Sequence, residues 1–291
     1  MSNLLNKDML TFLDFFAGVG GFRRGMEMAG HKCLGHCEWD KYANASYEVI
    51  HDIEEGEWFG RDIRDVRASE LPRADVWCFG FPCQDISVAG KQLGFDGKRS
   101  SLFYTVTRLI RDTQEENRPK YLFIENVKNL FSVNGGTDFL KLLIELDEIG
   151  YDAEWQLLNS WDFGLSQNRE RVFIIGHNRS KTTSKVLPIE TSCRRDSKAI
   201  RKTIRGTGKN CSGCLTTRQK QYGRKELDTL IYDYKNKTVR VMTPLEFAKC
   251  QGWTDDDFNK VATICADNQL YKQFGNGVSI PVIYEIAKRL E

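Results

Sequence analysis

The chain has 291 residues, of which 41% are hydrophobic and 28% are charged, an ordinary balance for a globular protein. This composition excludes a disordered chain, a collagen-like fibre and a long coiled coil, and no apolar run reaches the roughly 18 residues that a membrane-spanning helix needs. The length suggests about two domains. The first residues, MSNLLNKDML, lack the basic and long apolar stretches of a secretory signal peptide. The nine cysteines are irregularly spaced, so we expect reduced thiols in a cytoplasmic protein rather than a disulfide framework.

The net charge of +2 conceals a strongly basic segment. Residues 178–240 contain 17 Lys or Arg and 5 Asp or Glu, a net charge of +12, whereas the rest of the chain carries a net charge of −10. The segment is poor in large apolar residues, so it is either a solvated linker or a surface that binds a polyanion. Binding to phosphates is favourable for Lys and Arg because it releases counterions.

Apolar runs and helical patterns alternate before the basic segment. We predict strands over residues 9–16, 32–38, 74–83, 120–127, 151–160 and 171–178, and helices over residues 23–30, 41–50, 101–114 and 138–150. Two of these helices end at glycines, Gly30 and Gly150. After the basic segment we predict helices over residues 244–251 and 280–290. The alternation indicates an α/β protein whose parallel sheet has helices on both faces.

Polar residues and glycines gather where the predicted strands end. These positions are Asp14 with the following glycine turn, Glu38-Trp39, Asp62, Pro82-Cys83 and Glu125-Asn126. In an open α/β sheet, ligands bind beyond the carboxyl ends of the strands, so we expect these residues to form one site.

The glycines after the first strand predict a tight turn that a ligand can approach closely. The G-x-G-x-x-G pattern of dinucleotide-binding proteins is not met, because Arg23 occupies the position of its last glycine after Gly18 and Gly20. Glu38 follows at the distance where an acidic side chain binds ribose hydroxyls. Trp39 either stacks on a purine or is an aromatic residue of the core or its rim.

Three further motifs carry reactive or charged groups. Cys83, in GFPCQDIS, is either an inert buried thiol or a nucleophile displayed at the end of a strand. Glu125 is either a desolvated acid or a helix cap. Gln167, Arg169 and Arg171 form Q-x-R-x-R before an apolar strand, where alternate side chains share one side. They form either a solvated edge or a face that contacts an anion or a base.

Two short cysteine pairs do not predict a metal site. Cys211 and Cys214 resemble half of a zinc knuckle, but a second half at ligand spacing is missing. Cys33 and Cys37 likewise lack a second pair of ligands at suitable spacing. We expect no metal.

Taken together, the motifs resemble those of the C5-cytosine DNA methyltransferase family, in the family's order and over nearly the whole chain. The matching stretches are DFFAGVGGF, GFPCQDIS, ENV, QNRER, RVMTPLEFAKCQGW and QFGNGVSIPV, which begin at Asp14, Gly80, Glu125, Gln167, Arg240 and Gln273. Ser166 departs from the family pattern, in which proline often precedes the glutamine. Phe81 stands where the tRNA-methylating branch of the family usually has a second proline before the cysteine, and this difference favours DNA as the substrate.

The resemblance implies a doubly wound, mostly parallel, Rossmann-like methyltransferase sheet with a smaller inserted target-recognition domain. The catalytic and cofactor-binding domain would comprise residues 1–177 plus 263–291. The target-recognition domain would comprise residues 178–262, which contain the basic segment.

The resemblance also implies the chemistry. Cys83 attacks C6 of a flipped-out cytosine, Glu125 binds N3 and the exocyclic amine, and Arg171, together with Arg169, faces O2. S-adenosylmethionine is the implied cofactor. The residues implied to bind it are Phe16, Gly18, Gly20, Glu38, Trp39, Asp62, Pro82, Leu102, Asn276 and Val278.

The implied partner is double-stranded DNA, bound by a monomer in the cytoplasm, with a separately acting cognate restriction endonuclease as a further candidate. Two alternatives remain: a tRNA methyltransferase of the same family and a catalytically silent DNA-binding relative. The intact Cys83, Glu125 and Arg171 argue against the silent protein, and the basic insert favours DNA over tRNA.

Overall fold

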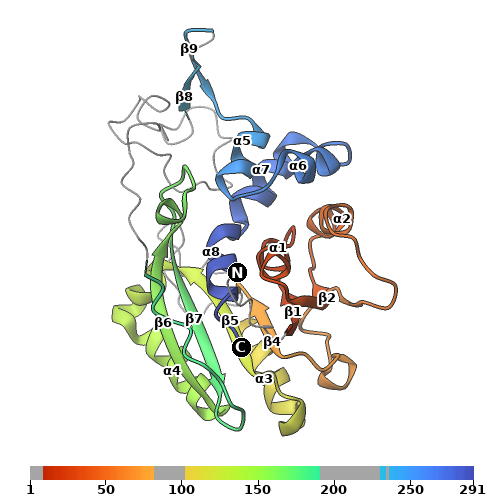
Figure 1. The fold of residues 1–291 in the computed structure, drawn as a ribbon, viewed down its shortest axis with the longest axis vertical. Coiled ribbons are helices and arrows are strands. Elements are labelled where there is room, and N and C mark those ends of the chain that lie inside the picture. Colours follow the sequence, from red (N-terminus) through yellow and green to blue (C-terminus); the bar gives the residue numbers. More distant parts are fainter. Residues whose placement is uncertain (1–8, 82–101, 191–229, 234–235) are drawn as a thin grey trace, which may run out of the picture.

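The computed structural model describes residues 9–81, 102–190, 230–233 and 236–291 (Figure 1). Pro82, Cys83 and most of the basic segment therefore lie outside the described residues. No helix in the described part of the chain is long and apolar enough to cross a membrane.

Seven strands form the central sheet, in the order β3-β2-β1-β4-β5-β7-β6. They are β1 (Thr11–Phe15), β2 (Lys32–Cys37), β3 (Trp58–Gly60), β4 (Val76–Phe79), β5 (Tyr121–Val127), β6 (Tyr151–Asn159) and β7 (Glu170–Asn178). The neighbours from β3 to β5 are all parallel, so their carboxyl ends lie at the same edge. The mostly parallel α/β fold is confirmed.

Strand β7 is the exception to the parallel arrangement. It pairs antiparallel with both β5 and β6. The connection from β6 to β7 spans residues 160–169, which is too short for a helical crossover, so the chain turns back as a hairpin. Strand β7 is therefore the antiparallel member of the mostly parallel sheet.

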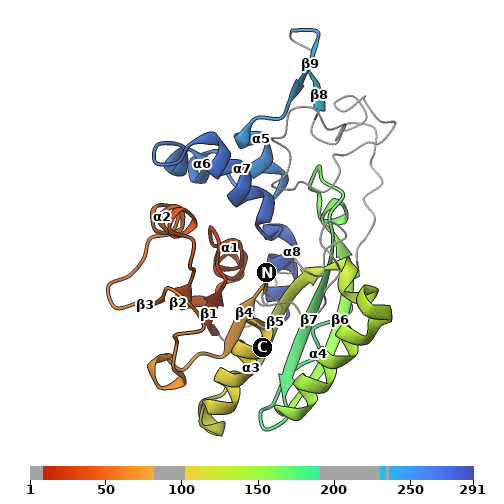
Figure 2. The same cartoon turned by 180° about the vertical axis from the view of Figure 1, so that it is seen from behind.

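Helices cover both faces of the sheet (Figures 1 and 2). The helices are α1 (Gly21–Met28), α2 (Lys41–Ile50), α3 (Leu102–Asp112), α4 (Thr137–Glu148), α5 (Pro244–Cys250), α6 (Asp255–Ala262), α7 (Asp267–Asn276) and α8 (Ile280–Ala287). Residues of α3 and α4 belong to the apolar cluster on one face, and residues of α1 and α8 belong to the cluster on the other.

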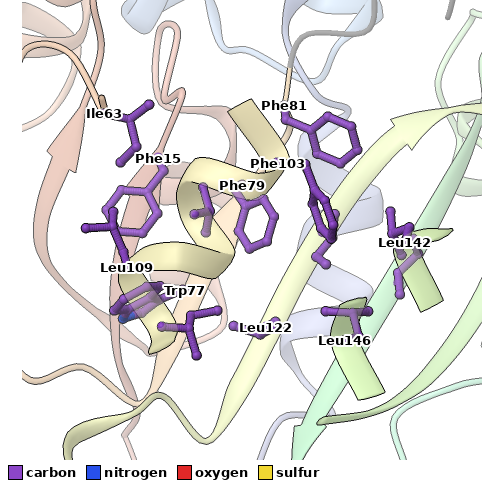
Figure 3. Close-up of a cluster of buried hydrophobic side chains, with 14 of the residues drawn as sticks. Phe15, Ile63, Trp77, Phe79, Phe81, Phe103, Leu109, Leu122, Leu142 and Leu146 are labelled. Carbon is purple, nitrogen blue, oxygen red and sulfur yellow. The ribbon is translucent and has the colours of Figure 1, made fainter. Parts of the chain in front are cut away.

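Alternation along the buried strands explains the two clusters. In β4, Trp77 and Phe79 point to the α3–α4 face, whereas Val76 and Cys78 point to the α1–α8 face. Figure 3 shows the first cluster, in which Phe79 and Phe103 lie among side chains from several elements. Because both faces of these strands are covered, they consist of nearly continuous apolar residues.

A third cluster forms the core of the α5–α7 helices. It joins Phe247, Trp253 and Phe274 to Val19, from the turn after β1, and to Ile50 at the end of α2. The turn after β1 therefore packs against a unit that lies more than 200 residues later in the chain.

The predicted elements correspond to observed ones with small shifts at their ends, but five of the described helices and strands were not predicted. Strand β3 has only three residues, and α6 and α7 are short and rich in polar residues. The other two are β8 (Leu230–Asp233) and β9 (Thr238–Val241), which form a hairpin that extends beyond α5 (Figure 1).

Candidate active site

The turn after β1 has a left-handed backbone at three positions. The φ angles are 56° at Phe16, 57° at Gly18 and 84° at Gly20. The Ala17 N–H donates to the Cys37 carbonyl at 3.1 Å, and the Gly20 N–H donates to the Ala17 carbonyl at 2.8 Å. These bonds fix the turn to the carboxyl end of β2, beside Glu38.

Glu38 bridges the turn and the start of α2. One carboxylate oxygen accepts the Gly18 N–H and the other accepts the Asp40 N–H, each at 2.8 Å. The side chain is buried, and this burial raises the pKa of Glu38. The carboxylate is thus held in one orientation at the point where β1 and β2 end.

Trp39 and Asp62 lie beyond the ends of β2 and β3. The Trp39 side chain is 71% exposed, which excludes its interpretation as a core aromatic residue. Asp62 accepts hydrogen bonds from the Arg64 guanidinium at 2.9 and 3.1 Å, and this pairing lowers the pKa of Asp62. The predicted site at the carboxyl edge of the sheet therefore includes an exposed indole and two ordered carboxylates.

Two glycines allow the turn and α1 to pack closely. A Cβ atom at Gly20 would lie 2.1 Å from Nε2 of His51, and one at Gly21 would lie 2.7 Å from Cγ2 of Val278. The second contact brings the Val278 segment, just before α8, against the start of α1. At Gly18 a Cβ atom would meet no atom of the described residues within 4 Å, so this side of the turn is open.

Glu125 and Arg171 form an ion pair near the end of β5. The Arg171 Nε lies 3.0 Å from Glu125 Oε1, and the two side chains are 15% and 13% exposed. Glu125 lies within the strand, which excludes a helix-capping role. A Cβ atom built on Gly80 would lie 3.2 Å from Glu125 Oε2, so the carboxylate also lies against the chain that follows β4.

The other two residues of Q-x-R-x-R are buried and bond to the backbone. Gln167 donates to the Cys250 carbonyl at 3.0 Å, and Arg169 donates to the carbonyls of Gly275 and Gly277 at 3.3 and 2.9 Å. The motif therefore connects the ends of α5 and α7 to the sheet, while its last residue contacts Glu125.

Of the remaining predicted residues, the structure describes Asn276, Val278 and Leu102. Asn276 is exposed at the end of α7, between the two carbonyls that Arg169 binds. Val278 and Leu102, the latter at the start of α3, are half-buried. Cys83 and Pro82 lie outside the described residues, and the structure gives no placement for them.

Two buried groups lie behind the turn: Asp14, which the sequence placed at the end of its strand, and His51, which sequence reasoning missed. Asp14 accepts the Arg23 N–H at 3.3 Å, and complete burial raises the pKa of Asp14 to about 8. His51 bonds to the Val19 carbonyl at 3.1 Å. A lone histidine at the end of a helix carries no recognisable pattern, so its contact with the turn could be found only in the fold.

The residues present fit S-adenosylmethionine. The turn is open at Gly18, Glu38 offers oriented carboxylate oxygens for ribose hydroxyls, and Trp39 offers an exposed ring for a purine. In the part of the chain that the structure describes, no group of three or more His, Cys, Asp or Glu side chains could hold a metal ion.

The chain is similar to known proteins over most of its length. The model of the C-5 cytosine-specific DNA methylase family matches residues 10–205 and 189–291. The type II methyltransferase M1.ScrFI of Lactococcus lactis subsp. cremoris is 32% identical, over 96% of this chain and 77% of that protein. M.DsaV of Dactylococcopsis salina is 31% identical, over 98% of this chain and 87% of that protein.

Solved structures show the same fold. DNMT2 of Spodoptera frugiperda aligns with a TM-score of 0.69 at 18% identity, over 96% of this chain and 99% of that one. The methyltransferase EhMeth of Entamoeba histolytica aligns with a TM-score of 0.67 at 20% identity, over 96% of this chain and 97% of that one. At such identities the similarity concerns the fold alone.

Proposed function

Since the chain belongs to the C-5 cytosine-specific DNA methylase family and is a DNA (cytosine-5) methyltransferase, we propose that it methylates a cytosine flipped out of a specific double-stranded sequence, through a covalent bond from Cys83 to C6. The Glu125–Arg171 ion pair carries this proposal, because it places an acid and a cation together at the carboxyl edge of the sheet. Gly80, which lies against Glu125, precedes Cys83 by three residues in the sequence.

The chemistry of the base explains why these groups are needed. C5 of cytosine is too weak a nucleophile to attack a methyl donor directly, and a thiolate added at C6 turns the ring into an enamine whose C5 can attack. After methyl transfer the C5 proton leaves, the electron pair of the C5–H bond re-forms the C5–C6 double bond, and the Cys83 thiolate is expelled. Because C5 and C6 are inaccessible within the stacked duplex, the target cytosine must leave the helix.

Glu125 and Arg171 act on different atoms of the cytosine ring. Glu125 binds the exocyclic amine and, in its protonated form, gives its proton to N3 as the thiolate adds; this withdraws charge from the ring and leaves the Glu125 carboxylate beside Arg171. Arg171 faces O2 and stabilises the negative charge that develops there. The ion pair supports these roles, since Arg171 holds the Glu125 carboxylate in one orientation. Arg169 lies just before β7, and its bonds to the carbonyls of Gly275 and Gly277 hold the backbone on either side of Asn276.

The proposed cofactor site contains residues from both the N-terminal and the C-terminal parts of the chain. S-adenosylmethionine supplies an electrophilic methyl group when bound. Glu38 would hold the ribose hydroxyls, Trp39 the face of the adenine and Asp62 the adenine amine. The other residues that we assign to this site are Phe16, Gly18, Gly20, Pro82, Leu102, Asn276 and Val278.

We further propose that residues 178–262 form the target-recognition domain and that residues 1–177 plus 263–291 form the catalytic domain. The +12 charge of residues 178–240 supports contact with DNA phosphates. The type II methyltransferases among the relatives support a partner endonuclease that acts separately on the same sequence.

Trapping on 5-fluorocytosine tests the mechanism. Fluorine cannot leave C5 as a cation, so an active enzyme stalls as a covalent protein–DNA adduct that carries the transferred methyl group. We expect the adduct to require S-adenosylmethionine, to survive denaturing electrophoresis and to map to the peptide containing Cys83.

Two substitutions serve as the test and its control. Cys83→Ser should abolish trapping, because a serine hydroxyl is far less ionised than a thiol. Cys78→Ser should leave the adduct on Cys83, because Cys78 is a fully buried thiol of β4 whose pKa burial raises. An active wild-type enzyme that forms no adduct would contradict the mechanism.

A further inference from the structure

His51 lies directly behind the turn that we assign to the cofactor. It follows the last residue of α2 and is 3% exposed. Its Nε2 lies 3.1 Å from the Val19 carbonyl oxygen, and because a carbonyl only accepts, the ring must donate from Nε2. Val19 lies between the two turn glycines, Gly18 and Gly20, so this bond fixes the peptide that separates them.

The surroundings of His51 leave the ring little freedom to move. Its centroid lies 4.6 Å from that of Tyr47 and 6.2 Å from that of Trp253 in the segment after α5. On the side of the turn, Gly20 packs so closely that a Cβ atom there would overlap Nε2. The imidazole is therefore confined between α2, the α5–α7 unit and the turn.

The ring is held in its neutral form. Burial, together with the positive charge of Arg23, lowers the pKa of His51 to about 3. Its Nδ1 has no hydrogen-bond partner among the described residues, which suits a neutral tautomer that carries its proton on Nε2. The bond to Val19 is consequently present throughout the physiological pH range.

We propose that His51 is a positioning residue for the methyl donor: its Nε2–H holds the Val19 carbonyl and so keeps the Gly18–Gly20 backbone in the conformation that receives S-adenosylmethionine. The inference rests on the proposed function, because it takes the turn to be the cofactor site. It assigns to His51 no contact with the cofactor or with DNA.

A matched pair of substitutions separates this role from simple packing. Gln and Met have similar volumes, but only Gln can donate a hydrogen bond from the position of Nε2. We therefore compare His51→Gln with His51→Met in the full chain. The control is His36→Met, because His36 is also buried and stacks on Tyr47 at 3.8 Å, but its Nε2 bonds to Asn44 at 2.8 Å.

The measurement is the dissociation constant for S-adenosylmethionine by calorimetry, together with Tm and the KM values for cofactor and DNA. We expect His51→Met to weaken cofactor binding about tenfold, the effect of one lost buried hydrogen bond, and His51→Gln to stay within about threefold of the wild type. His36→Met should lower Tm but leave the cofactor affinity within about threefold of the wild type. The KM for DNA should not change in any of the three variants.

Three results would overturn the proposal. Equal cofactor affinity of the Gln and Met variants would show that the donor is irrelevant. An equal loss in His36→Met would show a general loss of packing. If the wild-type protein binds no S-adenosylmethionine, the assignment of the turn as a cofactor site is wrong, and so is the proposed function. Should His51→Met not fold, His51→Gln still decides, because a tenfold loss there contradicts the proposal.

Discussion

Glu125 and Arg171 belong to neighbouring antiparallel strands and meet at 3.0 Å, with both side chains largely shielded from solvent. Breaking such a pair from either side leaves the other charge without its partner in a poorly solvated place. The pair is therefore a test of both stability and catalysis.

Glu125→Gln should slow methyl transfer by about 10²–10⁴-fold, the usual contribution of a positioned general acid, while DNA affinity changes little. Single-turnover transfer of labelled methyl groups measures the effect. The control is Glu170→Gln, next to Arg171 in sequence, which breaks an exposed pair with Lys128 and should alter stability by less than about 1 kcal/mol. A Glu125→Gln enzyme with a wild-type transfer rate would contradict the assigned role.

The sheet and its carboxyl edge were predictable because the relevant signals are local. Apolar runs mark the buried strands, and the glycines and acids that follow them mark where the strands end. The direction of β7 was not evident in the apolar run of residues 171–178, because it depends on the short connection from β6. Helix α6 was not predicted because its three consecutive aspartates gave it the polar composition of the insert.

The partners within the site were less predictable, because they depend on long-range contacts. Arg169 was interpreted as facing a base or an anion, but its described acceptors, the carbonyls of Gly275 and Gly277, lie more than 100 residues later. Backbone acceptors have no sequence signature. The bond from His51 to Val19 was missed for the same reason.

Asp14 should make stability depend on pH. Burial raises its pKa from an ordinary value near 4 to about 8 in the folded protein. Between these two values the unfolded chain ionises Asp14 and the folded protein does not, so its contribution to the free energy of unfolding falls as pH rises, by up to about 1.4 kcal/mol per pH unit. Above pH 8 this contribution becomes constant.

Asp14→Asn should remove this dependence while keeping an acceptor for the Arg23 N–H. Urea unfolding between pH 5 and pH 8.5 measures it: the variant should gain stability relative to the wild type as pH increases. Parallel profiles for the two proteins would mean that Asp14 does not titrate in this range.

Trp39→Ala should weaken S-adenosylmethionine binding by roughly 1–3 kcal/mol, the usual magnitude of stacking between a base and an aromatic side chain. Because the ring is 71% exposed, Tm should hardly change. Trp155→Ala is the control, since Trp155 is another exposed tryptophan, 46% exposed on β6. Calorimetry with the cofactor compares the two variants, and equal affinity of Trp39→Ala and wild type would contradict stacking.

The basic segment should dominate the salt dependence of DNA binding. Each phosphate that the protein neutralises adds about 0.9 to the slope of log affinity against log salt concentration. We expect neutral substitutions to flatten that slope when they are combined at Arg194, Arg195, Arg201, Lys202 and Arg205, five of the 17 basic residues in the segment. Fluorescence anisotropy with a labelled duplex at several salt concentrations measures it.

The control for this experiment replaces Arg108 and Lys288, two basic residues outside the segment. Within the protein, Arg108 already pairs with Asp112, and Lys288 already pairs with Glu285. Their removal should leave the slope unchanged, because it takes no counterion-releasing contact from the DNA. Cofactor affinity in the absence of DNA should remain at the wild-type value in both sets of variants, since neither set includes a residue assigned to the cofactor site. If the slope of the five-residue variant equals that of the wild type, the phosphate contacts lie elsewhere on the protein, and the assignment of residues 178–240 to DNA binding is wrong.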